Sequence, residues 1–266
     1  MQDHRSLVVI PTYNEIENID RIVEAVLGQP SGFDVLVVDD GSPDGTGQAV
    51  RRKQEEHPGR VHLLSRSGKL GLGTAYLDGF RWGLSEGYEF LFEMDADFSH
   101  DPADLNRLLL PALRNQADVV VGSRYTAGGH VENWPLDRKV LSYGASLYTR
   151  AITWMPIKDP TAGFKCYRRE VLEALELDGI RFIGYAFQIE MKFRAWQLGY
   201  RIAEVPITFT DRVEGQSKMS TGIVKEAILG VLQMRLRRPA RPAPVRKEVG
   251  AVGGAGAHVG VGTREP

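Results

Sequence analysis

The chain has 266 residues, of which 42% are hydrophobic and 25% are charged, the proportions of an ordinary globular protein. This length fits one large domain or two small ones, and the composition excludes a collagen-like chain, a disulfide scaffold and disorder over most of the length. The formal net charge of −1 indicates no general attraction to nucleic acid. The single cysteine, Cys166, excludes an intrachain disulfide, which predicts a reducing, cytosolic setting.

Up to Arg124 the chain alternates short apolar runs with segments of helical character. The apolar runs predict buried strands at residues 7–10, 35–38, 61–64, 90–94 and 118–121. The segments between them predict helices at residues 16–27, after 46, at 75–85 and at 102–114, the first of them capped by Asn14. This alternation predicts a mostly parallel sheet that is covered by helices on both faces.

After Arg124 the pattern is less regular. Helices are predicted at residues 139–154, 188–198 and 221–237, a short strand at 164–167, and an extended segment at 202–209. The composition then changes to proline, glycine, alanine and valine without periodicity. We therefore expect a single domain, residues 1–238, and a disordered tail, residues 239–266.

The sequence contains no segment suited to cross a membrane. No stretch approaches the roughly 20 consecutive apolar residues of a membrane span. No long apolar signal core precedes the first strand, so export is not expected. Any membrane contact is therefore expected to be peripheral or to go through a partner protein.

Three polar clusters directly follow predicted strands. They occupy residues 11–15, 39–42 and 95–97. Each has an ordinary alternative explanation, as a helix cap, a turn or a solvated loop. Together they fall where the strands of one parallel sheet end, and ligands of open α/β sheets bind beyond the carboxyl ends of the strands. The pattern therefore predicts a binding site at that edge of the sheet.

The pair Asp95 and Asp97 carries the most specific chemistry. Two carboxylates separated by one residue lie on the same side of an extended backbone and repel one another unless a cation lies between them. Such oxygen ligands suit Mg²⁺ or Mn²⁺, and Ser99 is close enough in the chain to add another oxygen. A metal bound there would neutralise charge on a diphosphate leaving group.

A glycine-rich segment, residues 68–74, invites comparison with phosphate-binding loops. It lacks the spacing and the Lys-Ser/Thr pair of a Walker loop. It also does not follow the first strand, so a Rossmann dehydrogenase is not expected. The glycines would still let the backbone approach a bound nucleotide closely.

Four motifs together resemble the signature of family 2 glycosyltransferases, and within it the dolichol- or polyprenol-phosphate mannose synthases. They are Pro-Thr-Tyr-Asn-Glu at 11–15, Val-Val-Asp-Asp-Gly-Ser-Pro-Asp-Gly-Thr at 37–46, Met-Asp-Ala-Asp at 94–97 and Gly-Ser-Arg at 122–124. The resemblance covers about residues 7–238. It implies a GT-A type α/β fold with amphipathic C-terminal helices, GDP-mannose as donor and a polyprenyl monophosphate as acceptor.

The resemblance also implies roles for individual residues of the donor site. The guanosine pocket would be lined by Pro11, Tyr13 and Glu15, with Val38 and Asp40 beside the base and the ribose. The sugar diphosphate would lie at Asp95, Ala96, Asp97 and Arg124. The metal, Mg²⁺ or Mn²⁺, would be held by Asp95, Asp97 and Ser99. A late loop would close over the diphosphate with Arg212 and Lys218.

The acceptor phosphate would be held, by the same resemblance, by Arg124, Arg138 and Ser142. A guanidinium can bind phosphate with two parallel hydrogen bonds. His100 is a candidate general base, but a phosphate monoester with a second pKa near 6 is already largely dianionic at neutral pH. We therefore expect Asp95, Asp97 and Arg124 to act in one in-line displacement with inversion, without a base.

Two amphipathic segments bear on location. Residues 140–155 and 223–234 are rich in apolar and aromatic side chains, which fits either core packing or a membrane interface. Many family members carry transmembrane helices after the catalytic domain, whereas this chain ends in the Gly/Pro-rich tail. We expect a peripheral protein at the cytosolic face of the membrane, held there in part by an integral membrane partner. The alternatives are a different donor such as UDP-glucose, or a non-catalytic nucleotide-binding protein.

Overall fold

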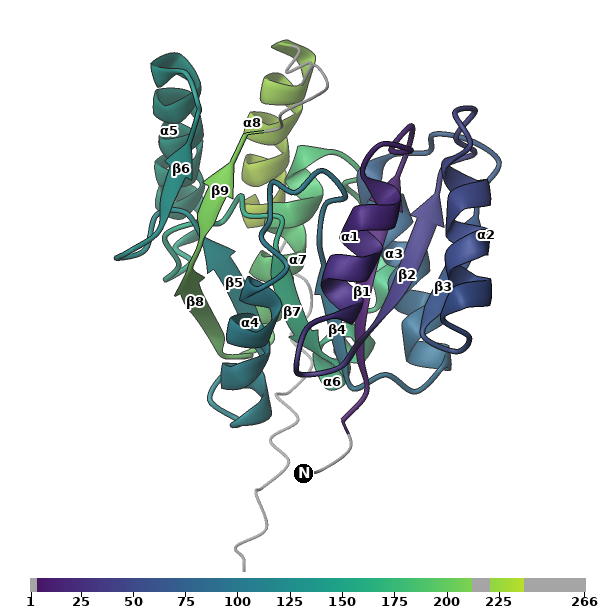
Figure 1. Cartoon of the computed structure of the whole chain (residues 1–266). Coiled ribbons are helices and arrows are strands. Elements are labelled where there is room, and N and C mark those ends of the chain that lie inside the picture. The colour runs from purple at the N-terminus through teal and green to yellow at the C-terminus, as the bar shows by residue number, and fades with distance from the viewer. Residues whose placement is uncertain (1–3, 212–220, 237–266) are drawn as a thin grey trace, which may run out of the picture.

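A computed structural model of the chain describes residues 4–211 and 221–236, and its centre is one open sheet (Figure 1). The strand order is β3-β2-β1-β4-β7-β5-β8. The strands are β1 (Ser6–Thr12), β2 (Phe33–Asp39), β3 (Val61–Ser65), β4 (Phe90–Glu93), β5 (Val119–Ser123), β7 (Lys165–Arg168) and β8 (Ile202–Pro206). Each predicted strand of the first half is present, so the pattern of apolar runs located the sheet correctly.

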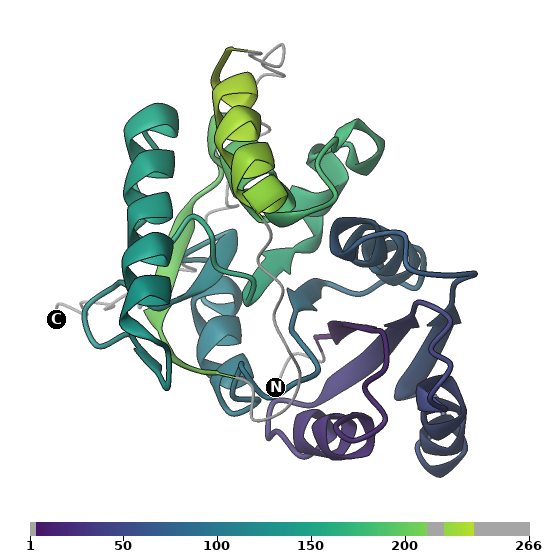
Figure 2. The same ribbon diagram turned by 90° about the horizontal axis from the view of Figure 1, so that it is seen from above.

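Helices cover both faces of the sheet, as predicted (Figure 2). They are α1 (Ile19–Leu27), α2 (Thr46–Glu56), α3 (Leu72–Ser85), α4 (Asp104–Leu113), α5 (Leu136–Thr153), α6 (Arg169–Ala174), α7 (Tyr185–Gln197) and α8 (Thr221–Leu236), with a short 3₁₀ turn at Leu177–Gly179. Val8 and Ile10 of β1 pack with α1, α2 and α4, whereas Leu7 and Val9 pack with α3, α6 and α7. The alternation of side chains along a strand thus supplies two cores.

The direction of the strands places the functional edge. β1 runs parallel to β2 and β4, and β5 runs parallel to β8. β7 lies antiparallel between β4 and β5, so β5 points the same way as β4. The carboxyl ends of β1, β2, β4 and β5 therefore meet at the same edge of the sheet, which is the upper edge in Figure 1.

A second, two-stranded sheet stands beside this edge. It pairs β6 (His130–Glu132) with β9 (Thr208–Thr210) in parallel. The sequence gave no sign of β6, and the extended segment 202–209 is interrupted at Ile207, whose backbone N–H donates to the Ser123 carbonyl. Ile207 is buried in the main core, and this separates β8 from β9.

One cap prediction was wrong. The first helix begins at Ile19, four residues after Glu15, and Asn14 does not cap it. Asn14 adopts a left-handed backbone conformation with φ of 61°, and its backbone N–H donates to Ser42 Oγ at 3.0 Å. The loop after β1 is therefore bound to the loop after β2, and this contact replaces the helical turn expected there.

Across the described residues, no helix combines the length and the apolar character that a bilayer crossing demands. The chain folds around one central sheet as a single domain. The tail predicted at residues 239–266 lies outside the described residues, so the domain boundary at 238 stays a prediction.

Candidate active site

The ends of β1 and β2 build one side of the site. Pro11 lies opposite Val38 in the register of the two strands, and Thr12 lies opposite Asp39. Thr12 Oγ1 donates to Asp39 Oδ1 at 3.0 Å, and Ser42 Oγ donates to the same oxygen at 2.5 Å. The sheet register thus makes neighbours of Pro11 and Val38, two predicted donor-binding residues that are 27 positions apart in the chain.

The two loops that follow these strands are bound to each other. The Glu15 N–H donates to Thr46 Oγ1 at 3.0 Å, and the Ile16 N–H donates to Asp44 at 3.1 Å. Burial alone would raise the pKa of Asp44, but the hydrogen bonds from Thr46 and Ile16 hold it below its usual value. Tyr13 lies on the same loop and remains 39% exposed, so its ring is accessible to a ligand.

Asp40 is paired with an arginine that the sequence analysis did not single out. Arg66 follows β3, and its side chain is only 6% exposed. Its Nε donates to Asp40 Oδ1 at 2.6 Å, and its Nη2 lies 2.5 Å from the same oxygen. A Cβ on the neighbouring Gly41, where φ is +70°, would come within 3.2 Å of the Arg66 carbonyl oxygen. Glycine is therefore required for the approach of these two loops.

The carboxylate pair follows β4 directly, at the middle of the edge. Tyr76 Oη donates to Asp95 Oδ1 at 3.3 Å, and the Ser99 N–H donates to Asp97 Oδ1 at 3.0 Å. Both aspartates are half-buried, whereas Ala96 and Ser99 are buried. The predicted diphosphate and metal residues thus form one short turn beyond the strand.

The chemistry of this turn fits a hard divalent ion. Asp95 and Asp97 offer carboxylate oxygens at a half-buried position, and Mg²⁺ and Mn²⁺ prefer oxygen ligands. In the described part of the chain no lysine or arginine pairs with Asp95, whose nearest cationic candidate is His100 at 3.9 Å. A closer triad of potential ligands, Glu24, Glu56 and His57, lies elsewhere on the surface. Two of its members already pair with Lys53, at 2.6 and 2.7 Å.

His100 supports the turn from below. The Asp95 N–H donates to its Nδ1 at 3.2 Å, and its ring stacks on Phe164 with 4.8 Å between ring centroids. Burial lowers the pKa of His100, which favours the neutral ring that this hydrogen bond requires. Nδ1 is therefore occupied as an acceptor, and this arrangement supports the expectation that His100 is no general base.

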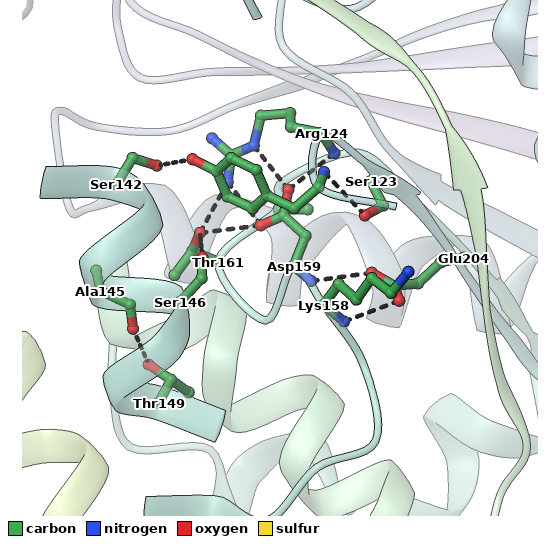
Figure 3. A network of polar contacts seen from close by, with 12 residues as sticks. Ser123, Arg124, Ser142, Ala145, Ser146, Thr149, Lys158, Asp159, Thr161 and Glu204 are labelled. Carbon is green, nitrogen blue, oxygen red and sulfur yellow. Dashed lines mark hydrogen bonds and ion pairs between the residues drawn. The ribbon is translucent and has the colours of Figure 1, made fainter. Parts of the chain in front are cut away.

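Arg124 follows β5 and is enclosed by partners (Figure 3). Its Nε and Nη2 each donate to Asp159 at 2.7 Å, and Nη2 also donates to Thr161 Oγ1 at 2.7 Å. Burial alone would raise the pKa of Asp159, but Arg124 holds it below its usual value. The pair is a two-pronged ion pair in a buried setting, which fixes the guanidinium in one orientation.

The loop that carries Asp159 is itself held from two sides. Glu204 of β8 accepts hydrogen bonds from the Lys158 and Asp159 N–H groups at 2.8 and 2.9 Å (Figure 3). The fully buried Lys192 of α7 donates to the Ala162 carbonyl at 2.6 Å. The sequence analysis named none of these supporting residues, because each acts through a partner that is distant in the chain.

The residues predicted at the acceptor phosphate come together around Tyr125 and Trp134. Tyr125 Oη donates to Ser142 Oγ at 2.7 Å, and Arg138 donates to Asp211 at 2.7 Å. The guanidinium carbons of Arg138 and Arg124 lie 4.2 and 5.6 Å from the centroid of the Trp134 ring. Two predicted phosphate-binding arginines therefore flank one aromatic ring.

Phe209 connects the two sides of the site. Its ring centroid is 5.4 Å from that of His100, which supports Asp95, and 5.7 Å from the guanidinium carbon of Arg124. The carboxylate turn and the arginines thus belong to one continuous site. Arg212 and Lys218, predicted to close over the diphosphate, lie outside the described residues, and their roles stay predictions.

An open α/β sheet with a carboxylate turn and paired arginines at one edge defines an enzyme of the type that handles nucleotides and phosphates. The model of the family "Glycosyl transferase family 2" matches residues 7–176. The chain belongs to this family, and it is a glycosyltransferase.

Two curated relatives are each 50% identical to this chain. One is an undecaprenyl-phosphate mannosyltransferase of Micrococcus luteus, and the alignment covers 87% of this chain and 94% of the relative. The other is a polyprenol monophosphomannose synthase of Mycolicibacterium smegmatis, with 88% of each chain covered. The resemblance seen in the sequence motifs is thereby confirmed.

Solved structures confirm the GT-A type fold. A glucosyl-3-phosphoglycerate synthase from Mycobacterium tuberculosis, in complex with Mn²⁺, UDP-glucose and phosphoglyceric acid, superposes with a TM-score of 0.63 at 17% identity, covering 90% of this chain and 82% of that one. A mannosyltransferase from Pyrobaculum calidifontis, in complex with GDP-mannose and Mn²⁺, gives a TM-score of 0.56 at 20% identity, covering 90% and 66%. At these identities the likeness concerns the fold alone.

Proposed function

We propose that this glycosyltransferase transfers mannose from GDP-mannose to a polyprenyl monophosphate, with the help of a divalent metal ion and with inversion at the sugar. The observation that carries the proposal is the 50% identity, over nearly the full length, to two relatives named for mannose transfer to polyprenyl phosphates. A GDP-mannose and Mn²⁺ complex of a mannosyltransferase with the same fold supports the donor and the metal.

The donor would lie across the ends of β1, β2 and β4. Pro11, Tyr13 and Glu15 would line the guanosine pocket, with Val38 and Asp40 beside base and ribose. The diphosphate would extend along the turn 95–97, where Asp95, Asp97 and Ser99 would hold Mg²⁺ or Mn²⁺. A bound ion would neutralise the charge that develops on the departing GDP. Arg212 and Lys218 would close over the diphosphate from the late loop.

The acceptor phosphate would lie on the β5 side, held by Arg124, Arg138 and Ser142. Asp159 fixes the Arg124 guanidinium in advance, so little reorganisation is needed when the phosphate arrives. A largely dianionic phosphate needs no base, and its oxygen would attack the anomeric carbon in line with the leaving diphosphate. A single displacement of this kind converts an α-linked donor into a β-linked mannosyl phosphate.

The surface of α5 supports peripheral contact with a membrane. The buried residues of this helix are small and hydroxylic, namely Ser146, Thr149 and Thr153. Its exposed side chains include large apolar ones, among them Leu136, Val140, Leu141, Tyr143 and Leu147. The helix thus carries apolar groups on the outside, beyond the edge where the strands end (Figure 1), as a helix lying in a lipid interface does. We place the enzyme at the cytosolic face, with an integral membrane partner as a second anchor.

A labelled-sugar assay tests the proposal. Purified enzyme with Mg²⁺ and undecaprenyl phosphate in vesicles is given radiolabelled GDP-mannose or UDP-glucose, and label in the organic-soluble lipid is counted. We expect label from GDP-mannose and little from UDP-glucose. Preference for the uridine donor would establish the alternative donor, and no lipid label from either would favour a non-catalytic role. Omission of the lipid is the control for hydrolysis of the donor.

A further inference from the structure

Arg66 has no part in the donor site described above, yet it contacts that site more closely than most of its neighbours. We propose that Arg66 is a positioning residue for nucleoside recognition. Its buried guanidinium presents one oxygen of Asp40 to the nucleoside and holds the glycine-rich loop beside it. The inference rests on the proposed function in taking Asp40 as a nucleoside contact.

The contacts of Arg66 with Asp40 are one-sided. Nε and Nη2 both reach Oδ1, at 2.6 and 2.5 Å. Among the described residues, no hydrogen bond or ion pair is found at Asp40 Oδ2. Because Oδ1 is occupied by the guanidinium, Oδ2 is the oxygen that remains to accept a hydrogen bond from a nucleoside hydroxyl or N–H group.

The opposite side of the guanidinium holds the start of α3 and the loop before it. Nη1 donates to Thr74 Oγ1 at 2.8 Å and to Asp78 Oδ2 at 3.2 Å. Thr74 Oγ1 in turn donates to the Gly71 carbonyl at 2.7 Å. In the same loop Lys69 Nζ lies 4.8 Å from the centroid of the Tyr13 ring. The guanidinium therefore fixes the glycine-rich loop against the residues predicted to line the guanosine pocket.

The burial of this arrangement predicts which step of the reaction it serves. The Arg66 and Asp40 side chains are 6% and 10% exposed, so the loss of Arg66 leaves a buried carboxylate without its counter-charge. Asp95 and Asp97 are supported instead by Tyr76 and Ser99. Removal of Arg66 should therefore weaken nucleoside binding and leave the transfer step nearly unchanged.

The same two strands offer a matched control. Arg60 precedes β3 and pairs with Asp34 of β2 at 3.2 Å, at the end of the sheet away from the site. Arg66→Met and Arg60→Met therefore each remove one arginine from an Arg–Asp pair between neighbouring strands. Only the first pair lies at the carboxyl ends.

The test measures the Kd of GDP by calorimetry with Mg²⁺ present, and the inhibition constant of pyrophosphate as a nucleoside-free competitor. We expect Arg66→Met to weaken GDP about 30-fold, the size of a lost hydrogen-bonded charge contact. Pyrophosphate inhibition and kcat should stay within about threefold of wild type, because neither involves the nucleoside contact. For Arg60→Met we expect a Kd within about twofold of wild type. Thermal unfolding of each variant confirms that it is folded.

A conservative variant covers the case in which Arg66→Met does not fold. Arg66→Lys keeps the charge but lacks the planar fork, and we expect GDP to bind it about tenfold more weakly. Unchanged GDP binding, or equal weakening of GDP and pyrophosphate, would overturn the inference. UDP is measured in parallel: if wild type prefers UDP, the proposed donor is wrong, and the effect of Arg66 is then read from the UDP values.

Discussion

The donor side and the acceptor side of the site are built in different ways. On the donor side, the loops after β1 and β2 are joined by hydrogen bonds between short polar side chains and backbone N–H groups, such as Ile16 to Asp44. On the acceptor side, the guanidinium of Arg124 is buried and depends on Asp159, which is 35 positions away in the chain. The donor side is thus a set of local turns, and the acceptor side a buried network of charges.

This difference suggests how each side responds to damage. A turn that is bound to backbone groups keeps its shape when one ligand-binding side chain is removed, so such a change on the donor side should affect chemistry alone. A buried ion pair loses stability as well as geometry when one partner is removed. Variants on the two sides should therefore separate activity from stability in opposite ways.

The largest effect is expected at the carboxylate turn. Asp97→Ala removes one of the two proposed metal ligands, and several kcal/mol of charge stabilisation correspond to a loss of about 1,000-fold in kcat. The unfolding temperature should change little, because Asp97 is half-buried in a turn. Asp101→Asn, on the exposed loop four residues later, is the control and should keep nearly full activity. An Asp97→Ala variant with wild-type kcat at saturating metal would contradict the metal role.

The next largest effect is expected at Asp159. Asp159→Asn leaves Arg124 buried without its counter-charge and should cost about 3 kcal/mol of unfolding free energy. Loss of the fixed guanidinium should also lower kcat/KM for the lipid acceptor about 100-fold. Asp118→Asn breaks the more exposed pair with Arg201 at the opposite end of β5, and should cost less than about 1 kcal/mol. Equal losses in the two variants would remove the distinction between the sides.

The Asp159 pair also predicts a dependence on pH. Because the folded pKa of Asp159 lies below its unfolded value of about 3.9, its contribution to stability is present above about pH 4. That contribution is lost as the pH falls through the folded pKa. Denaturant unfolding of wild type and Asp159→Asn should therefore converge as the pH falls below about 4. A constant gap between the two proteins down to pH 2 would refute this linkage.

A smaller effect is expected at Arg138. It is half-buried, pairs with Asp211, and lies against the Trp134 ring. Arg138→Ala should raise the KM for the polyprenyl phosphate about tenfold, the cost of one charge-assisted hydrogen bond, and leave the KM for GDP-mannose unchanged. Arg150→Ala, in the last turn of the same helix, is the control. A rise in the donor KM instead would place Arg138 on the donor side.

The smallest effect is expected on the exposed face of α5. Leu136→Ser with Val140→Ser removes two side chains that are 77% and 64% exposed. Partial burial of such groups in lipid is worth about 1 kcal/mol, so vesicle binding should fall about fivefold. The control pair, Leu110→Ser with Leu113→Ser, alters exposed leucines of α4. Equal losses in a flotation assay would show general stickiness rather than a membrane-binding face.

The fold and the donor side could be predicted from the sequence because both are written in contiguous segments. Apolar runs located β1, β2, β3, β4 and β5, whereas β6, with three residues, is too short to show a period. Asn14 was assigned to a cap because its side chain type favours caps, but its backbone contact with Ser42 draws the loop away from a helix.

The supporting residues could not be predicted, because their roles depend on tertiary contacts. Arg66 is a single arginine after a strand, and nothing local marks it as the partner of Asp40. Asp159 lies in a loop where an aspartate is ordinary, and Lys192 is a charged residue on a helix. Burial gives each its importance, and burial of an isolated charge is visible only in the folded chain.

The account depends most on two neighbouring carboxylates that would carry the metal and the diphosphate between the two sides. Crystals soaked with GDP-mannose and MnCl₂, with anomalous data collected at the manganese edge, test it directly. We predict one manganese peak between Asp95 and Asp97, with the diphosphate beside it. Nucleotide bound with both carboxylates turned away from it, and manganese only at Glu24, Glu56 and His57, would contradict the account.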